Sequence, residues 1–102
     1  MRIRVAVIGG GSWGTTVAHL AAHQVPTVLW ARRPELADEI NSTHANPRYL
    51  PGLQLHPDLV ATADLAEAVH SADVIVMGVP SQGFRPALEA VAEHVRAWVP
   101  VL

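Results

Sequence analysis

The residues with the clearest chemical potential are three glycines near the amino terminus, Gly9, Gly11 and Gly14, which match the pattern GxGxxG. They follow an apolar, mostly β-branched run that predicts a strand, and they precede a run that predicts a helix. In this position between a strand and a helix, the short pattern is a stronger indication of dinucleotide binding than it would be elsewhere. In that context the first glycine permits a tight turn, the second lets the backbone approach a pyrophosphate, and the third lets the helix pack near the strand. The N–H groups and the positive dipole end of the helix attract the diphosphate. The spacing therefore predicts a dinucleotide-binding turn, with Ser12 and Trp13 close enough to touch the ligand.

Two arginines stand where the ribose of such a ligand would be recognised. NAD-specific sites usually place an acidic residue at the end of the second strand, about 20 residues past the glycines. This sequence has Arg32 and Arg33 there instead. Because guanidinium groups suit a 2′-phosphate, we expect NADP as the preferred cofactor, with NAD as the second. The alternative is that both arginines are solvated charges at a strand end.

Other polar and aromatic side chains give weaker signals. Ser81 follows a buried strand, so it either faces the cofactor at the carboxyl edge of the sheet or caps the next helix. His19 and His23 have the i, i+4 spacing of a metal pair, but no third ligand is evident in the sequence, and we expect no metal site. Tryptophan rings such as Trp13 and Trp30 are more often core than cofactor contacts, although the place of Trp13 on the glycine turn favours contact.

Composition excludes several classes of function. The chain has 102 residues, a formal net charge of -2 and no cysteine, so nothing indicates a nucleic-acid partner, a membrane partner or a cysteine-based metal site. No signal peptide is visible and no apolar run approaches the ~20 residues of a membrane span, so a cytoplasmic location is expected. All 7 basic residues are arginine, and without lysine the chain cannot supply a lysine acid, Schiff base or phosphate clamp.

The pattern along the chain predicts the elements that position these residues. Strands are expected at residues 3–8, 27–30, 59–62 and 73–79. Helices are expected from about residue 13 to before Pro26, at 34–40, at 64–70 and in a last segment closed by Pro100. The apolar spacing predicts buried helix faces formed by Trp13, Val17, Leu20 and Ala21, and by Leu88, Val91, Ala92, Val95 and Val99. The order implies an α/β fold, a Rossmann-type parallel sheet with helices on both faces.

We assign residues 1–102 to one dinucleotide-binding domain that is incomplete. Val101 and Leu102 look like the start of a fifth strand, so we expect the chain to be truncated there and to belong to something longer with a substrate domain. Residues 41–52 are rich in turn formers and predict a long loop, which is often functional.

The sequence resembles the N-terminal part of bacterial NAD(P)-dependent glycerol-3-phosphate dehydrogenase in five stretches that come in order: VIGGGSWGTTVA, LWARR, INSTHANPRYLPG, ATADLAEAV and VIVMGVPSQ. The most specific features are GxGxWGT together with Asn46, Tyr49, Leu50, Pro51 and Gly52. The resemblance covers essentially this whole chain, but only about the first third of such an enzyme.

The resemblance implies an enzyme that reduces dihydroxyacetone phosphate, a phosphorylated small molecule, to sn-glycerol 3-phosphate with NAD(P)H for phospholipid synthesis. It implies dinucleotide contacts from Ser12, Trp13, Arg32, Arg33 and Tyr49, and it favours Arg33 for the 2′-phosphate. It also implies that residues 46–52 lie at the ligand edge of the sheet, that the active-site lysines lie beyond Leu102, and that a homodimer is compatible. Residues 1–102 alone are therefore expected to be inactive.

Two other interpretations stay open at this stage. One is the N-terminal domain of another two-domain dehydrogenase, of the ketopantoate or sugar-acid type, against which the Tyr-Leu-Pro-Gly run argues. The other is a non-catalytic dinucleotide-sensing module, which we would expect to complete its own sheet.

Overall fold

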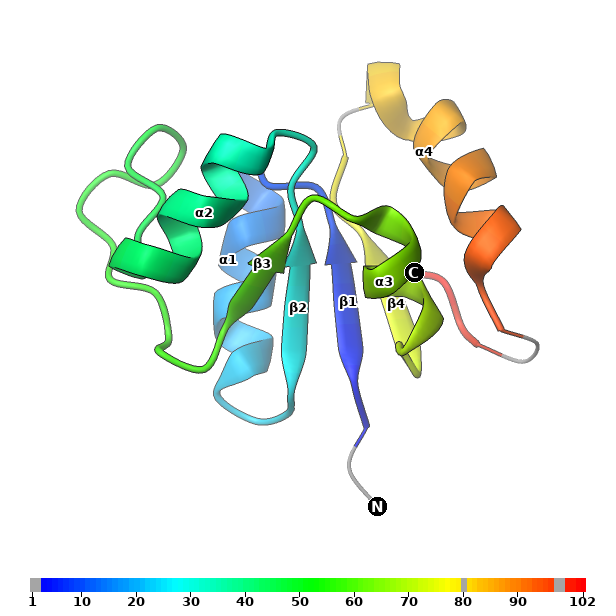
Figure 1. The fold of residues 1–102 in the computed structure, drawn as a ribbon, viewed down its shortest axis with the longest axis horizontal. Coiled ribbons are helices and arrows are strands. Elements are labelled where there is room, and N and C mark those ends of the chain that lie inside the picture. Colours follow the sequence, from blue (N-terminus) through cyan, green and yellow to red (C-terminus); the bar gives the residue numbers. More distant parts are fainter. Residues whose placement is uncertain (1–2, 80, 97–98) are drawn as a thin grey trace.

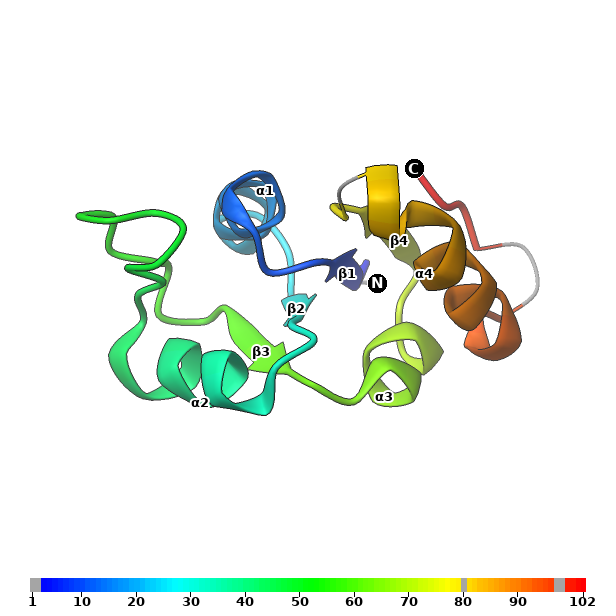
Figure 2. The same cartoon turned by 90° about the horizontal axis from the view of Figure 1, so that it is seen from above.

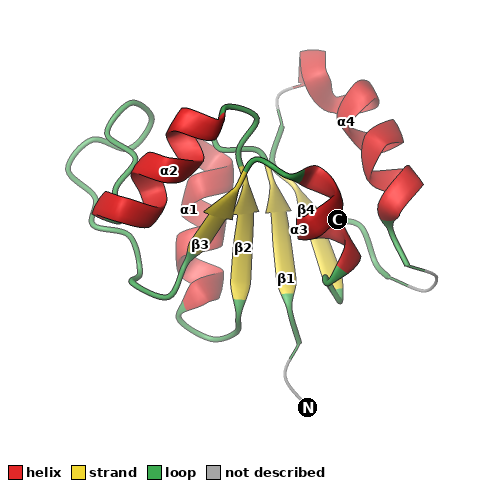
Figure 3. Ribbon diagram, viewed as in Figure 1, coloured by secondary structure: helices red, strands yellow, loops and turns green. Residues whose placement is uncertain are grey.

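The computed structural model describes residues 3–79, 81–96 and 99–102, with the side chains of all of these except residues 81 and 82. Strands and helices alternate along the chain (Figure 1 and Figure 3). The strands are β1 (Val5–Ile8), β2 (Thr27–Trp30), β3 (Val60–Thr62) and β4 (Val74–Met77). The helices are α1 (Ser12–Ala22), α2 (Pro34–Thr43), α3 (Leu65–His70) and α4 (Ser81–His94). All the predicted elements are therefore present, and β1, β3 and β4 are shorter than predicted.

The four strands form a parallel sheet in the order β3-β2-β1-β4. In the central strand β1, Ala6 and Ile8 pack on one face and Val7 on the other, and all three are buried, as expected for a strand covered on both faces. Outside β4, the N–H of Leu102 donates to the carbonyl of Ile75 at 2.8 Å, and its carbonyl accepts from the N–H of Met77 at 2.8 Å. The last residues thus pair with β4 in parallel, which confirms the expected start of a further strand.

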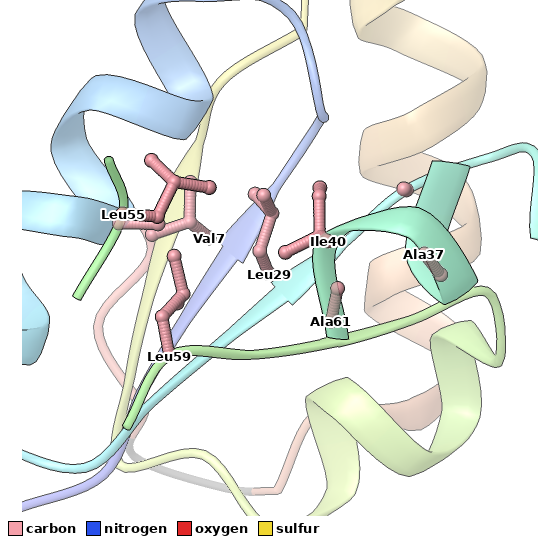
Figure 4. Packing of buried hydrophobic residues seen from close by; sticks show 9 residues of the cluster. Val7, Leu29, Ala37, Ile40, Leu55, Leu59 and Ala61 are labelled. Atoms are coloured by element: carbon pink, nitrogen blue, oxygen red, sulfur yellow. The ribbon is translucent and has the colours of Figure 1, made fainter. Parts of the chain in front are cut away.

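Helices cover both faces of the sheet, as predicted. Figure 2 shows α1 and α3 on opposite sides of the line of strands. One core cluster joins α1 and α2 to the sheet, and Figure 4 shows its buried residues, among them Val7, Leu29, Ala37, Ile40, Leu55, Leu59 and Ala61. A second cluster joins α3 and α4 to the opposite face, through Ala6, Ile8, Val69, Ile75 and Val91. The sheet is therefore packed between two hydrophobic clusters, one on each face.

The predicted buried face of α1 is only partly correct, because Val17 packs against the first core cluster but the two largest predicted residues do not. Trp13 is 59% exposed and Leu20 is 60% exposed, whereas Gly14, Thr15 and Ala18 are buried against the sheet. The reason is close approach, because a helix can come near a glycine turn only on a face of small side chains. The two largest apolar residues of the predicted face, Trp13 and Leu20, therefore lie at the surface of this helix.

The predicted face of α4 is only partly correct. Val91 is 1% exposed and Val95 and Val99 pack against the same cluster, but Leu88 and Ala92 are exposed. The helix also ends at His94, before the predicted stop at Pro100.

Local signals place the other helices. Pro34 opens α2 in the first turn, and Asp64 caps α3 by accepting the N–H of Glu67 on Oδ1 at 3.1 Å, as its spacing predicts. Helix α2 runs three residues past the predicted end at Ile40. It stops where His44 adopts a left-handed conformation with φ 53° and donates its N–H to the carbonyl of Ile40. A glycine usually marks such a stop, and none is present there.

Candidate dinucleotide-binding site

The glycine turn joins the carboxyl end of β1 to the amino end of α1, and two of its glycines are required by packing. Gly9 has φ +125°, a conformation that side chains rarely adopt, and a Cβ there would lie 2.7 Å from the carbonyl oxygen of Gly78. A Cβ at Gly14 would lie 2.0 Å from the carbonyl oxygen of Gly9. Gly78, at the end of β4, completes this close contact, since its own Cβ would lie 2.9 Å from the Cα of Gly14. The fold itself therefore demands glycine at these positions.

Gly11 is a glycine for a different reason. It is the N-cap of α1 with φ -75° and ψ -170°, an extended conformation open to any residue, and a Cβ there would meet no atom within 4 Å. Beside it, Ser12 and Trp13 are exposed in the first turn, where backbone N–H groups have no acceptor within the helix. Open space next to such donors fits the diphosphate of a dinucleotide, which would fill the room that a side chain at Gly11 would occupy.

A buried polar bridge fixes the turn from the side of the loop that follows α2. The amide nitrogen of Asn46 donates to the carbonyl of Gly10 at 3.0 Å and to the hydroxyl of Thr15 at 2.9 Å. The same hydroxyl donates to the carbonyl of Gly10 at 3.2 Å. Both side chains are fully buried. The start of this loop, at Asn46, thus lies against the glycine turn. This agrees with the expectation that residues 46–52 lie at the carboxyl edge of the sheet.

A small hollow of about 110 Å³ lies beside the start of α2. Its lining residues are Arg33, Glu35, Leu36, Glu39, Arg48 and Tyr49. The guanidinium of Arg48 sits over the ring of Tyr49, 5.9 Å from its centroid. Leu36, which lines the hollow, also lies next to the glycine turn, because its Cδ2 would be 3.1 Å from a Cβ at Gly10. The structure therefore brings Arg33 and Tyr49 together at one hollow, which Arg32 does not line, although all three residues are exposed.

The remaining candidates separate into different parts of the molecule. Ser81 begins α4, but its side chain lies outside the described residues. The indole N–H of Trp30 donates to the carbonyl of Ala63 at 3.0 Å and its ring packs on the core, so it is structural. Trp13 is not a core residue: it projects from the first turn of α1, beside Gly78.

Three histidines gather at the opposite end of α1. The ring of His23 lies 4.9 Å from that of His19 and 4.6 Å from that of His56, and the Nδ1 of His19 accepts the backbone N–H of His56 at 3.0 Å. Burial lowers the pKa of His19, and the charges of His23 and His56 lower it further. Over the described ranges, no group of three His, Asp or Glu side chains has a geometry that could hold a metal ion.

A larger cavity of about 260 Å³ lies at the amino ends of the strands, away from the glycine turn. Arg4, Pro26, Asp58 and Glu67 are among its lining residues. Ligands of open α/β sheets bind beyond the carboxyl ends of the strands, so volume alone does not make this cavity the site.

The fold and the turn define the class: a Rossmann-type domain with a glycine-rich turn between its first strand and first helix. The family described as NAD-dependent glycerol-3-phosphate dehydrogenase N-terminus matches residues 4–102, and the chain belongs to that family. A glycerol-3-phosphate dehydrogenase [NAD(P)+] of Sphingopyxis alaskensis is 53% identical over 102 residues, which are 100% of this chain and 31% of the relative.

Solved structures agree with this assignment. A glycerol-3-phosphate dehydrogenase of Saccharomyces cerevisiae matches 99% of this chain with a TM-score of 0.91 and 32% identity, over 33% of its own length. A ketopantoate reductase of Ralstonia eutropha matches 97% of this chain with a TM-score of 0.78 and 24% identity, over 33% of its own length. The second likeness shows a shared fold alone. The chain thus spans about a third of the relatives that it matches.

Sequence reasoning missed several residues around the turn. Arg48 carried no separate signal, since one exposed arginine in a turn is ordinary. Thr15 looked like any polar helix residue, and Gly78 like the end of a strand. Asn46 was noticed only as part of a resemblance, and its contact with Gly10 spans 36 residues. Of these residues, Gly78 could have been recognised from the sequence, because a glycine at the carboxyl end of a strand often marks a place where another part of the backbone approaches closely.

Proposed function

We propose that this chain is the dinucleotide-binding domain of an NAD(P)-dependent glycerol-3-phosphate dehydrogenase. The whole enzyme would reduce dihydroxyacetone phosphate to sn-glycerol 3-phosphate for phospholipid synthesis. The observation that carries the proposal is Gly11, whose backbone does not need glycine but whose side-chain position is open space at a helix N-terminus. Membership of the family supplies the substrate and the reaction.

The site residues would act on the cofactor as follows. The turn at Gly9, Gly11 and Gly14 and the first N–H groups of α1 would hold the diphosphate, with Ser12 and Trp13 beside it. When bound, the cofactor supplies the hydride. Its diphosphate would be held by the backbone N–H groups and the positive dipole end of α1.

Recognition of the ribose would fall to the hollow beside α2. Arg33 and Arg48 both line this hollow, and the guanidinium of Arg48 lies 5.9 Å from the centroid of the Tyr49 ring. This supports NADP as the preferred cofactor and NAD as the second, because a guanidinium pairs strongly with a phosphate. Arg32 and Ser81 remain proposed contacts at the edge of the site.

Catalysis would need residues outside this chain. The proton for the new alkoxide and the contacts to the phosphorylated substrate are proposed to come from a further domain, so residues 1–102 would be inactive alone. A cytoplasmic homodimer, without nucleic-acid or membrane partners, is the proposed form of the whole enzyme. Among the helices that the structure describes, none has both the length and the apolar character to cross a bilayer.

The test uses the full-length protein that carries this domain. Calorimetry should detect NADPH binding, and addition of dihydroxyacetone phosphate should oxidise NADPH. Gly11→Val should abolish binding while the protein stays folded, since its side chain would enter the diphosphate space and a Cβ at this position lies in open space. Leu20→Val, an exposed change on the same helix, is the control and should bind as wild type. A folded Gly11→Val protein with wild-type NADPH affinity would overturn the proposal.

A further inference from the structure

Asn46 holds the glycine turn and the Arg48–Tyr49 turn at the same time. Its side chain is 0% exposed and donates to the carbonyl of Gly10 and to the hydroxyl of Thr15. Its backbone carbonyl accepts the N–H of Tyr49 at 3.2 Å and the N–H of Leu50 at 2.8 Å. One residue thus connects the proposed diphosphate site to the proposed ribose site.

The orientation of the amide is determined by its partners. The carbonyl of Gly10 can only accept, so the nitrogen of Asn46 must face it and the oxygen must point away. Within the part of the chain that the structure describes, Oδ1 of Asn46 is buried and has no hydrogen-bond partner. A fold that needed only a buried polar link would not leave an acceptor unmatched, because an unsatisfied buried group costs stability. The nitrogen is therefore retained for what it does to the turn.

We propose that Asn46 is a positioning residue for dinucleotide binding. It sets the direction of the Gly10 carbonyl, and thereby the backbone that leads to Gly11, before the ligand arrives. A turn that is already in the bound conformation loses less entropy on binding. This inference rests on the proposed function, since it needs a dinucleotide at the turn.

The chain provides a matched control in Asn41. Its amide donates to the carbonyl of Ala61 at 2.8 Å and its oxygen accepts the N–H of Ala61 at 2.8 Å. Like Asn46, Asn41 makes two side-chain hydrogen bonds to a distant part of the chain, but it is an exposed residue of α2 and its partner is Ala61 in β3, away from the glycine turn. Asn41→Ala measures what losing such a link does to the fold alone.

The experiment measures the dissociation constant of NADP⁺ for the folded full-length protein, with the melting temperature alongside. Asn46→Ala should weaken NADP⁺ binding by roughly tenfold, the effect of one buried hydrogen bond lost from the bound conformation. Asn41→Ala should lower the melting temperature but leave the dissociation constant unchanged. If Asn46→Ala does not fold, the dissociation constants of Asn46→Asp and Thr15→Val are compared with that of wild type instead, because both substitutions keep the shape of the side chain.

A pH profile separates positioning from simple loss of structure. In Asn46→Asp the carboxyl is buried, which raises its pKa, and only its protonated form can donate to the Gly10 carbonyl. The ratio of the variant's dissociation constant to that of wild type should therefore fall as the pH is lowered. NADP⁺ is the probe because it is stable in acid. Titration of its phosphate affects the dissociation constants of the variant and of wild type equally, so it cancels in their ratio.

The outcomes are distinct. Wild-type protein that binds neither NADP⁺ nor NAD⁺ overturns the proposed function and this inference together. Wild-type binding with an unchanged dissociation constant in the folded Asn46 variants overturns this inference alone. So does an equal loss of affinity in Asn41→Ala, or a ratio for Asn46→Asp that does not change with pH.

Discussion

At the scale of single residues, the three glycines of the GxGxxG pattern have different physical reasons. Gly9 needs its positive φ, and Gly14 needs the space that the Gly9 carbonyl occupies. Gly11 needs neither, because its conformation is ordinary and its surroundings are open. Packing and backbone conformation therefore explain Gly9 and Gly14, and the proposed binding of the diphosphate explains Gly11, so the two roles can be measured separately.

The first prediction concerns this separation. Gly14→Ala should lower the free energy of unfolding of the ligand-free protein by about 3 kcal/mol or more, because its methyl group would force backbone atoms apart. Gly11→Ala should change it by less than about 1 kcal/mol. Urea unfolding of the two variants in the full-length protein checks both. Equal stability in the two variants would show that the close contact seen at Gly14 is relieved at no cost.

The second residue-scale prediction concerns cofactor choice. Arg33→Ala should weaken NADPH binding by roughly ten- to a hundredfold and leave NADH nearly unchanged, since a charge-assisted bond to phosphate contributes about 1.5–3 kcal/mol. Arg48→Ala should act in the same direction, because Arg48 lines the same hollow. Both dissociation constants are measured at one salt concentration for these variants and for Arg32→Ala, which removes the same charge from a residue that does not line the hollow. Equal losses for NADH and NADPH in all three variants would contradict 2′-phosphate recognition.

At the scale of elements, the end of α1 is joined to the loop before β3 by histidines. The imidazole of His19 accepts a backbone N–H from His56, and it can accept only while that nitrogen is unprotonated. Burial and two neighbouring imidazoles lower the pKa of His19, so the folded state holds it neutral. This junction lies far from the glycine turn, so its titration bears on stability rather than on the proposed binding site.

The pH dependence follows from the sign of that shift. Because the pKa of His19 is lower in the folded protein than its ordinary value of 6.5, the unfolded chain binds more protons. The stabilisation is fully present above pH 6.5 and is lost as the pH falls below that value. Unfolding free energies between pH 5 and 8 should show the loss, and His23→Gln should reduce it by removing one repelling charge. A wild-type stability that rises on acidification through this window would refute the assignment.

At the scale of the whole molecule, this chain matches about a third of its relatives and contains no lysine. Its described part has a sheet with two covered faces and the proposed cofactor site at one edge. Residues 1–102 should therefore show no turnover with dihydroxyacetone phosphate and NADPH in an absorbance assay. A rate near that of ordinary enzymes, ~1 s⁻¹ or faster, would show that the catalytic groups lie within this chain.

Local patterns in the sequence were sufficient to predict the order of elements, the parallel sheet and the glycine turn. β-branched runs, turn-forming residues and the Asp64 cap act over a few neighbouring residues, so each can be recognised without its partners. The glycine spacing also has a local cause, because the first strand and the first helix are adjacent in the chain. The sequence thus predicted the class of domain and the position of its glycine turn.

Tertiary structure alone decided which side chains meet. The small face of α1 is buried, rather than the large one, because the helix approaches the backbone of Gly9 and Gly78. Asn46 reaches Gly10, Arg48 joins Arg33, and His56 meets His19 across separations that no periodic pattern records. These contacts depend on how the loop after α2 folds over the first core cluster, and a loop has no repeating period from which its path could be predicted.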